Sequence, residues 1–208
     1  GYLANQAGYQ TSTYEKQVYV FPSLPGCGWA GLGGGSQAWI NQSLSLLVVG
    51  HELGHTFGLG HASSVDCGAV TLGGTCTKSE YGDPFEIMGN QRAMHFNAAH
   101  KDELGYLPAG TVRAQKLGVM TYTLQPLQTA GATRQYWVEY RQAVGFDAAL
   151  SGNTNVLNGA LVHLGYPNDY GCDTCFIDMT PATTAFTDGA LTVGNTFVDG
   201  DTGTAIGV

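Results

Sequence analysis

The stretch HELGHTFGLGH, residues 51–61, contains three of the six histidines of this 208-residue chain and a single acid, Glu52. Hydrophobic side chains and the first two of these histidines recur at spacings of three and four between residues 43 and 57, which predicts a helix. On that helix His51 and His55 are separated by one turn, about 6 Å of rise, so both imidazoles project from the same face.

The third histidine, His61, cannot reach the same point if the helix continues, because six further residues would carry it about 9 Å along the axis. Gly58 is where the chain can turn, since glycine alone enters the left-handed region at low steric cost. With a turn at Gly58, His61 returns toward His51 and His55. Three imidazoles can bind one tetrahedral zinc ion at about 2.0–2.1 Å and leave the fourth position open for water.

Glu52 is adjacent to His51 and therefore flanks the expected ion instead of binding it. A carboxylate so placed can act as the general base on a metal-bound water. The residues thus predict a catalytic Zn²⁺ site with three histidine ligands and Glu52 as the base. The alternative is that the three histidines are only surface or capping residues. This alternative gives no role to Glu52 or to the His51–His55 pair.

The pattern HExxHxxGxxH resembles the zinc signature of metzincin metalloproteases. The combination of HELGHTFGLGH, EYGDPFEIMG and HFNAAHKDELGYL, preceded by VYVFP and CGWAGLGGGSQAWIN, is most similar to the gametolysin family of secreted proteases, over about residues 17–107. The resemblance implies peptide-bond hydrolysis and places Met88 in a methionine turn under the zinc site, although Met88 alone could equally be a core residue. Some metzincins have a tyrosine two residues later; here that position is Asn90, so no transition-state tyrosine is assigned.

The coarse order of elements indicates an α+β protein. Strands are expected over residues 17–21 and 37–41, and helices over 43–57 and 96–104, with the second helix closed by Gly105 and Pro108. Residues 62–90 between the helices are expected to form a long irregular connection.

Two domains are expected, with a boundary near residue 110. Residues 1–110 would form a metzincin-like catalytic domain, a mixed sheet plus the active-site helix. In residues 111–208, short strand-like runs separated by Gly, Asn, Asp and Pro are typical of an antiparallel β-sandwich. The first 50 residues are fewer than metzincin domains usually have before this helix, so an upstream segment is expected to have been cut away or to lie on another piece. Whether a removed propeptide once covered the zinc is left open by the sequence.

The segment QAWIN, which contains Ala38, Trp39 and Ile40, is a candidate substrate strand. As an edge strand it could pair with an extended peptide, because β-addition fixes a backbone without requiring a particular sequence. The alternative is an ordinary internal strand with neighbours on both sides of Trp39.

Five cysteines suggest structural disulfides. Cys67 and Cys76 bracket a glycine-containing loop, Cys172 and Cys175 form a CxxC, and Cys27 is left over. No second CxxC completes a zinc knuckle, so two disulfides in a secreted, extracellular protein are the preferred interpretation.

The formal net charge of −8 limits the class of partner. No cluster of Lys and Arg is present that could displace counterions from nucleic acid or hold an anionic membrane surface, and no apolar run reaches the roughly 18 residues of a membrane span. The expected partner is a protein or peptide substrate. The chain has neither an initiator Met nor a signal sequence, which suggests a processed product.

Several weaker signals are set aside. GCGWAG at 26–31 satisfies GxGxxG, but no helix is expected to open on it, so a dinucleotide site is not favoured. His95 and His100 are five residues apart and are expected at the surface or the edge of the core, and His163 is expected to be structural. The acids of FVDGDTG, residues 197–203, could form a calcium loop, but a polar hairpin turn is preferred.

Two other functions are kept open. One is a zinc hydrolase that uses the same helix on a non-peptide bond. The other is a non-catalytic adhesion or binding module that retains the metal site.

Overall fold

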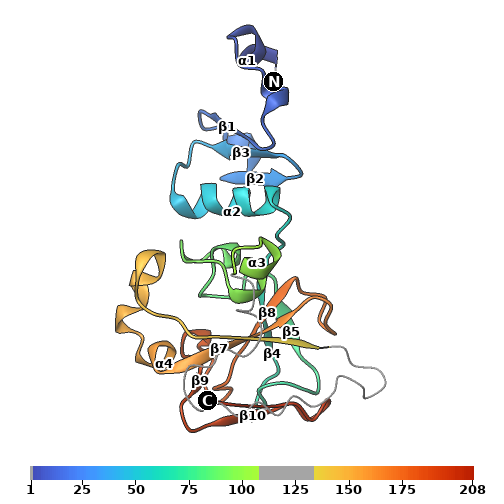
Figure 1. Ribbon diagram of the computed structural model, residues 1–208, viewed down its shortest axis with the longest axis vertical. Helices are drawn as coiled ribbons and strands as arrows, with labels where there is room; N and C mark the ends of the chain where they lie inside the picture. The colour runs from blue at the N-terminus through green and yellow to red at the C-terminus, as the bar shows by residue number, and fades with distance from the viewer. Residues whose placement is uncertain (1, 108–133) are drawn as a thin grey trace. The chain divides into compact units, whose positions relative to one another are not determined.

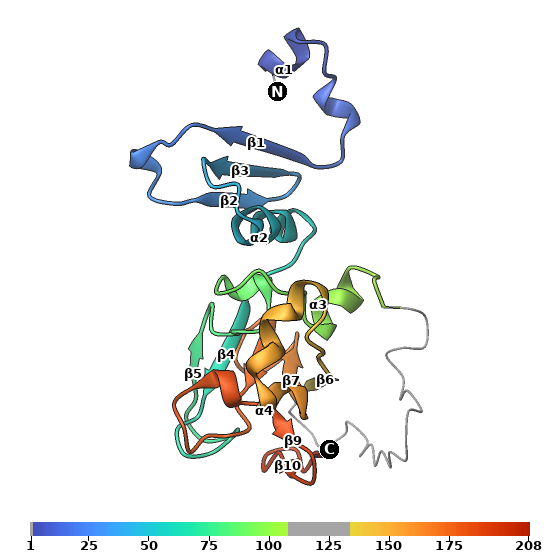
Figure 2. The same cartoon turned by 90° about the vertical axis from the view of Figure 1, so that its left-hand side faces the viewer.

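The computed structural model describes residues 2–107 and 134–208. These belong to two compact units, Gly1–Leu59 and Gly60–Val208, and each unit is described by itself (Figures 1 and 2). The first unit contains the helices α1 (Tyr2–Gln6) and α2 (Leu46–Thr56), the 3₁₀ turns η1 (Thr11–Thr13) and η2 (Pro25–Cys27), and the strands β1 (Gln17–Phe21), β2 (Gly31–Gly34) and β3 (Gln37–Asn41).

The strands of the first unit form a three-stranded sheet in the order β1-β3-β2. β1 runs parallel to β3 and β2 runs antiparallel to it. Helix α2 packs along β2 and β3 (Figure 2), and Ala38 and Ile40 of β3 are fully buried. The strands expected over residues 17–21 and 37–41 are therefore confirmed.

The expectation that QAWIN lies at the sheet edge is wrong. Trp39 pairs with Tyr19 on one side and with Leu32 on the other, so Ala38, Trp39 and Ile40 belong to the central strand. The cause is a two-residue hairpin loop, in which Gly35 has φ +56° and turns the glycine-rich β2 back onto β3. Within the described residues, the open edge next to α2 belongs to β2.

The second unit is built on a mixed sheet. Within the described residues its strand order is β5-β4-β8-β7-β6, with β9 also paired to β7. β4 and β8 are parallel and the other pairs are antiparallel. The strands are β4 (Ala62–Asp66), β5 (Thr77–Ser79), β6 (Gln135–Glu139), β7 (Gly159–Gly165), β8 (Thr174–Ile177) and β9 (Leu191–Thr192), with the hairpin β10 (Thr196–Val198) and β11 (Ala205–Gly207) beside them.

Short helices connect these strands. They are the helices α3 (Ala98–Glu103) and α4 (Thr154–Leu157) and the 3₁₀ turns η3 (Ile87–Gly89), η4 (Gly145–Gly152) and η5 (Phe186–Asp188). α3 confirms the second predicted helix, and Asn97 caps it by accepting the His100 N–H at 3.0 Å. The expectation of an irregular connection over 62–90 is wrong where β4 and β5 form.

The predicted boundary near residue 110 lies outside the described residues. Strands from both sides of it share one sheet, because β4 and β5 precede it and β8, β7 and β6 follow it. The protein is therefore mixed α+β, and an independent β-sandwich over 111–208 is not confirmed.

β7 pairs with β6, β8 and β9, and all seven of its residues are buried. Val162 and Leu164 contribute to one hydrophobic cluster and Leu161 to another.

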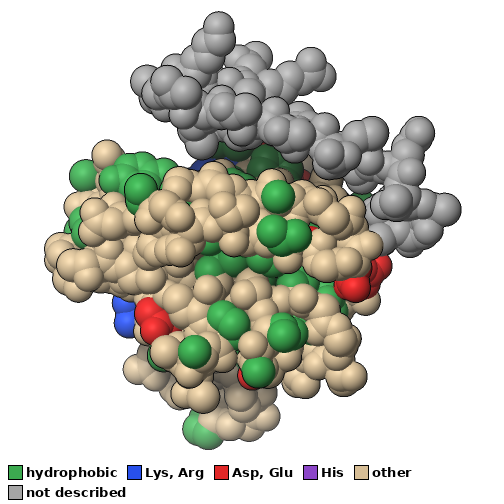
Figure 3. Space-filling model, turned by 90° about the horizontal axis from the view of Figure 1, so that it is seen from below, with side chains coloured by type: hydrophobic (Ala, Val, Ile, Leu, Met, Phe, Trp, Pro, Cys, Tyr) green, Lys and Arg blue, Asp and Glu red, His purple; other side chains and the backbone are tan. Residues whose placement is uncertain are grey.

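On the face drawn in Figure 3, charged side chains are sparse and hydrophobic ones are scattered among polar groups. This agrees with the sequence, in which charged residues are 12% of the total.

The cysteines lie as expected for two disulfides. Cys67 is bonded to Cys76, which closes the loop between β4 and β5, and Cys172 is bonded to Cys175 at the start of β8. Cys27 is a free cysteine. No helix among the described residues has the length and apolar character needed to cross a membrane.

Candidate metal centre

The first two histidines of the candidate site lie on α2, which has defined ends. Ser45 caps its N-terminus by accepting the Val48 N–H. At the other end, Gly58 has φ +103°, in the left-handed region where the sequence predicts a turn. The Leu59 N–H donates to the Gly54 carbonyl and the Gly58 N–H to the His55 carbonyl, which is the Schellman pattern of helix termination.

The turn brings the three histidines of the motif together. His51, His55 and His61 each offer a ring nitrogen, and these atoms all lie within 4.8 Å of one another. The Nε2 atoms of His51 and His55 are 3.1 Å apart, close to the separation of about 3.3 Å for two nitrogens bound to one tetrahedral zinc ion. The three side chains thus form a cluster compatible with a metal site.

Two of the rings are held by hydrogen bonds through their Nδ1 atoms. His55 Nδ1 lies 2.9 Å from the Leu59 carbonyl oxygen and His61 Nδ1 lies 2.8 Å from Glu80 Oε1. Both oxygens accept, so each Nδ1 donates, and in the neutral ring Nε2 keeps its lone pair for a metal ion. The His61 ring also packs against the Tyr81 ring, tilted by 39°, with a centroid distance of 4.1 Å.

Glu52 is mostly buried, with 8% of its surface exposed. Burial raises the pKa of its carboxyl group, opposed by the electrostatic influence of the nearby His55 and by a hydrogen bond from the Gly33 N–H. A carboxylate that is desolvated but held by a backbone donor is a suitable proton acceptor for a neighbouring water.

Two glycines of β2 make room for Glu52. A Cβ at Gly31 would lie 2.6 Å from Glu52 Oε1, and a Cβ at Gly33 would lie 2.9 Å from the Glu52 Cα and carbonyl carbon. At Gly34 a Cβ would meet nothing within 4 Å. The glycines of GLGG therefore differ in function: only Gly31 and Gly33 let β2 approach the helix that carries Glu52.

Met88 lies in η3 and is fully buried. Its N–H donates to Glu86 Oε2 at 3.0 Å, and Asn90 ends the turn with φ +54°. The segment is thus a tight buried turn, and its role beneath a zinc site stays a prediction.

The sequence predictions for the other histidines were partly correct. His163 is structural as expected: it is fully buried and its Nε2 bonds to Asp83 at 2.9 Å. His100 is also fully buried, which corrects its expected place at the surface or core edge, while His95 is not among the buried residues.

The acids proposed as a weak calcium loop hold a guanidinium group instead. Arg134 donates to Asp199 at 2.7 Å, to Asp201 at 2.8 Å and to Asp169 at 2.8 Å. β10 and β11 pair on either side of these acids. The preferred alternative, a polar hairpin turn, is therefore confirmed. The GxGxxG segment leads into β2 and not into a helix, as expected.

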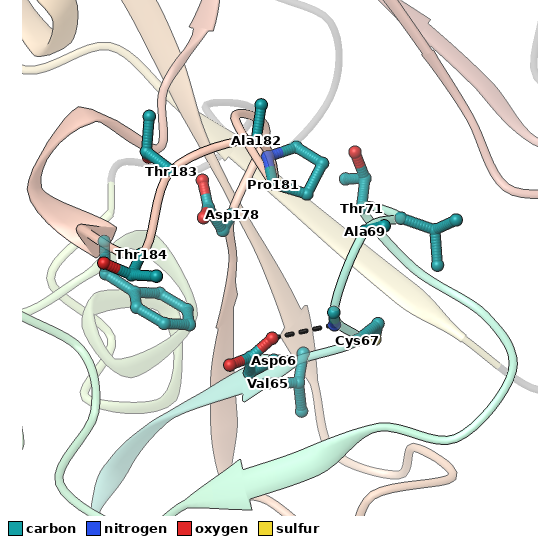
Figure 4. A pocket seen from close by; sticks show the side chains of 13 residues that line it. Val65, Asp66, Cys67, Ala69, Thr71, Asp178, Pro181, Ala182, Thr183 and Thr184 are labelled. Atoms are coloured by element: carbon teal, nitrogen blue, oxygen red, sulfur yellow. Dashed lines mark hydrogen bonds between the residues drawn. The ribbon is translucent and has the colours of Figure 1, made fainter.

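The second unit also has a pocket beside the Cys67–Cys76 loop (Figure 4). Its acids, Asp66 and Asp178, are engaged locally: Asp66 accepts from the Gly68 N–H and Asp178 from the Thr180 N–H, each at 2.8 Å. The remaining lining residues are mainly small or carry hydroxyl groups. The pocket therefore has fewer groups suited to catalysis or metal binding than the histidine cluster.

Sequence reasoning missed the partners that orient the cluster. Glu80 and Tyr81 lie some twenty residues after His61, and Gly31 and Gly33 lie on a strand that glycine would not predict. The only sequence signal for Glu80 and Tyr81 is their place in EYG, just before the segment that contains Met88.

A family model described as gametolysin peptidase M11 matches residues 4–194. The match extends well beyond residues 17–107, on which the resemblance of the motifs rested. No curated protein and no solved structure matches the chain significantly.

Proposed function

Since the chain belongs to the gametolysin peptidase family, whose members are metallopeptidases, we propose that it is a zinc-dependent endopeptidase of metzincin type. The observation that carries the proposal is the convergence of His51, His55 and His61 within 4.8 Å. Three neutral imidazoles and an open fourth position are the donor set of a catalytic zinc site.

In this mechanism zinc, when bound, polarises the scissile carbonyl and makes a water molecule acidic. Glu52 accepts the proton of that water and delivers it to the leaving amine. The Gly33 N–H orients the Glu52 carboxylate for this transfer. Met88 supports the site from its buried turn, as the family resemblance implies.

The substrate backbone pairs with β2, which takes over the role first expected of β3. β2 has β3 as its partner on one side, and among the described residues its other edge is open. It also contacts α2 and carries the Gly33 that binds Glu52. An extended peptide added to this edge would be held by backbone hydrogen bonds next to the general base.

Secretion and extracellular protein substrates are part of the proposal. They are supported by the two bonded cysteine pairs, since disulfides persist in oxidising compartments.

Replacing Glu52 with Gln tests the function. The variant should retain about one zinc ion per chain and lose cleavage of casein or gelatin by several orders of magnitude, because glutamine cannot accept the proton. The Glu15→Gln variant, at an exposed position of the same unit, is the matched control and should cleave normally. Cleavage by the Glu52 variant at the wild-type rate would rule out Glu52 as the general base. A wild type that holds zinc but cleaves nothing would favour a protein that only binds, and cleavage of ester but not peptide substrates by the wild type would favour a non-peptide hydrolase.

A further inference from the structure

The segment that carries His61 is held by a carboxylate far away in sequence. The Gly60 N–H donates to Asp173 Oδ2 at 2.6 Å. The approach is close, because a Cβ on Gly60 would lie 2.8 Å from the Asp173 Cβ. Strand register explains this contact: Ala62 of β4 pairs with Thr174 of β8, so the residues just before each strand lie together.

Asp173 is itself fixed on both sides. It lies inside the CxxC whose cysteines, Cys172 and Cys175, are bonded to each other. The next residue, Thr174, accepts a hydrogen bond from Asn97 at 2.9 Å. Asn97 is the residue that caps α3, so the helix start and the Asp173 loop are joined.

His100 of α3 bridges Asp173 to a second acid. Its Nε2 lies 3.0 Å from Asp173 Oδ2 and its Nδ1 lies 3.0 Å from Glu86 Oε1. A neutral imidazole has only one N–H, so two carboxylates on two ring nitrogens indicate an imidazolium. Burial acts to lower the pKa of His100, but the hydrogen bonds with Asp173 and Glu86 outweigh it and raise the pKa to about 10.

The other oxygen of Glu86 accepts the Met88 N–H at 3.0 Å. The side chains of Glu86 and His100 are fully buried, and that of Asp173 is 29% exposed. A continuous path of hydrogen bonds thus runs from the Met88 turn through Glu86, His100 and Asp173 to Gly60, the residue before His61. We call the side chains of Glu86, His100 and Asp173 the His100 bridge.

We propose that the His100 bridge is a positioning device for the metal site, which fixes the backbone at Gly60 so that the His61 imidazole is held ready for the ion. The inference rests on the proposed function, because it takes His61 to be a metal ligand. The bridge residues bind no metal themselves. They act through the Gly60 N–H, and the hydrogen bond with the charged His100 holds the Asp173 acceptor in place.

The full-length, zinc-loaded protein provides the test. Zinc release to a chelator is timed for the wild type and for His100→Gln, Asp173→Asn and Gly60→Ala, together with the visible spectrum of each Co²⁺-substituted protein. Each single variant should release zinc about tenfold faster or more, as is typical when an outer partner of a metal ligand is lost. The Co²⁺ bands should shift, because the geometry at His61 changes.

His163→Gln is the matched control. His163 is also fully buried and hydrogen-bonded to a buried carboxylate, that of Asp83. Its variant therefore measures how much zinc release changes when a buried histidine–carboxylate hydrogen bond elsewhere in the unit is lost. It should leave zinc release and the Co²⁺ spectrum unchanged. The His100→Gln/Asp173→Asn double variant should release zinc no faster than the quicker single variant, since both break the same path.

Gly60→Ala breaks the contact from the backbone side, because the added Cβ would lie 2.8 Å from the Asp173 Cβ and push the two segments apart. It retains all three side chains of the bridge, so the test survives if His100→Gln does not fold. The proposal is overturned if the folded variants release zinc at the wild-type rate or no faster than His163→Gln. A wild type that holds zinc but cleaves no peptide would instead refute the proposed function and leave this comparison valid.

Discussion

Replacing Gly33 with alanine should disable the site while causing only moderate loss of stability. The added Cβ would lie 2.9 Å from the Glu52 Cα and carbonyl carbon, whereas non-bonded carbons pack at about 3.5–4.0 Å. β2 must therefore move away from α2 by about 1 Å. Overpacking of this kind costs about 1–3 kcal/mol, which lowers Tm by about 2–4 °C per kcal/mol in a chain of this size.

The effect on catalysis should be larger than the effect on stability. The same movement lengthens the hydrogen bond from the Gly33 N–H to Glu52 and displaces the edge on which the substrate is proposed to lie. A misplacement of about 1 Å can reduce a rate by about 100-fold. We therefore expect kcat/KM for peptide cleavage to fall by about two orders of magnitude while zinc content is unchanged.

Gly34→Ala is the control on the same strand, because a Cβ there meets nothing within 4 Å. Thermal denaturation, zinc analysis and peptide hydrolysis are measured on both variants. If Gly33→Ala matched Gly34→Ala in stability and in kcat/KM, the close approach of β2 to Glu52 would not be what orients the base.

Three further changes have expected outcomes. Glu80→Gln weakens the hydrogen bond that holds His61 Nδ1, so zinc affinity measured by chelator competition should fall about tenfold. An unchanged affinity would mean that Glu80 does not orient the ring. Burial acts to raise the pKa of Asp199, but hydrogen bonds led by the one from Tyr136 hold it at about 2. The ionised Asp199 therefore stabilises the folded protein above the unfolded pKa of about 4, and this stabilisation is lost as pH falls toward 2. Asp199→Asn should reduce the loss of unfolding free energy between about pH 4 and about pH 2 in acid unfolding curves. Removing the Cys67–Cys76 disulfide by a double serine replacement should cost about 3 kcal/mol of unfolding free energy, and a loss of zinc binding instead of stability would contradict its structural role.

Local patterns predicted α2 and its end well. The spacing of His51 and His55 requires a helix, and the left-handed Gly58 follows from the need to bring His61 back. These features depend on residues close together in sequence, where periodicity and steric rules apply directly. The strands β1 and β3 were recognisable for the same reason, from their β-branched and aromatic side chains.

Pairing between distant residues could not be predicted in this way. β2 consists almost entirely of glycine and has no strand propensity, yet it takes the sheet edge because a hairpin places it there. β4 is a short, polar strand that forms because β8, more than a hundred residues later, pairs with it. His100 looked like a residue of the surface or the core edge because its two carboxylate partners, Glu86 and Asp173, come from other segments.

The most direct test of the central claim is metal analysis of the purified wild type combined with a chelator-reversible digestion assay. We expect one zinc ion per chain, loss of the ion and of gelatin cleavage together on chelation, and recovery of both when Zn²⁺ is restored. Cleavage that persists in the metal-free protein, or a wild type that binds no zinc, would contradict the assignment of His51, His55 and His61 as the ligands of a catalytic ion.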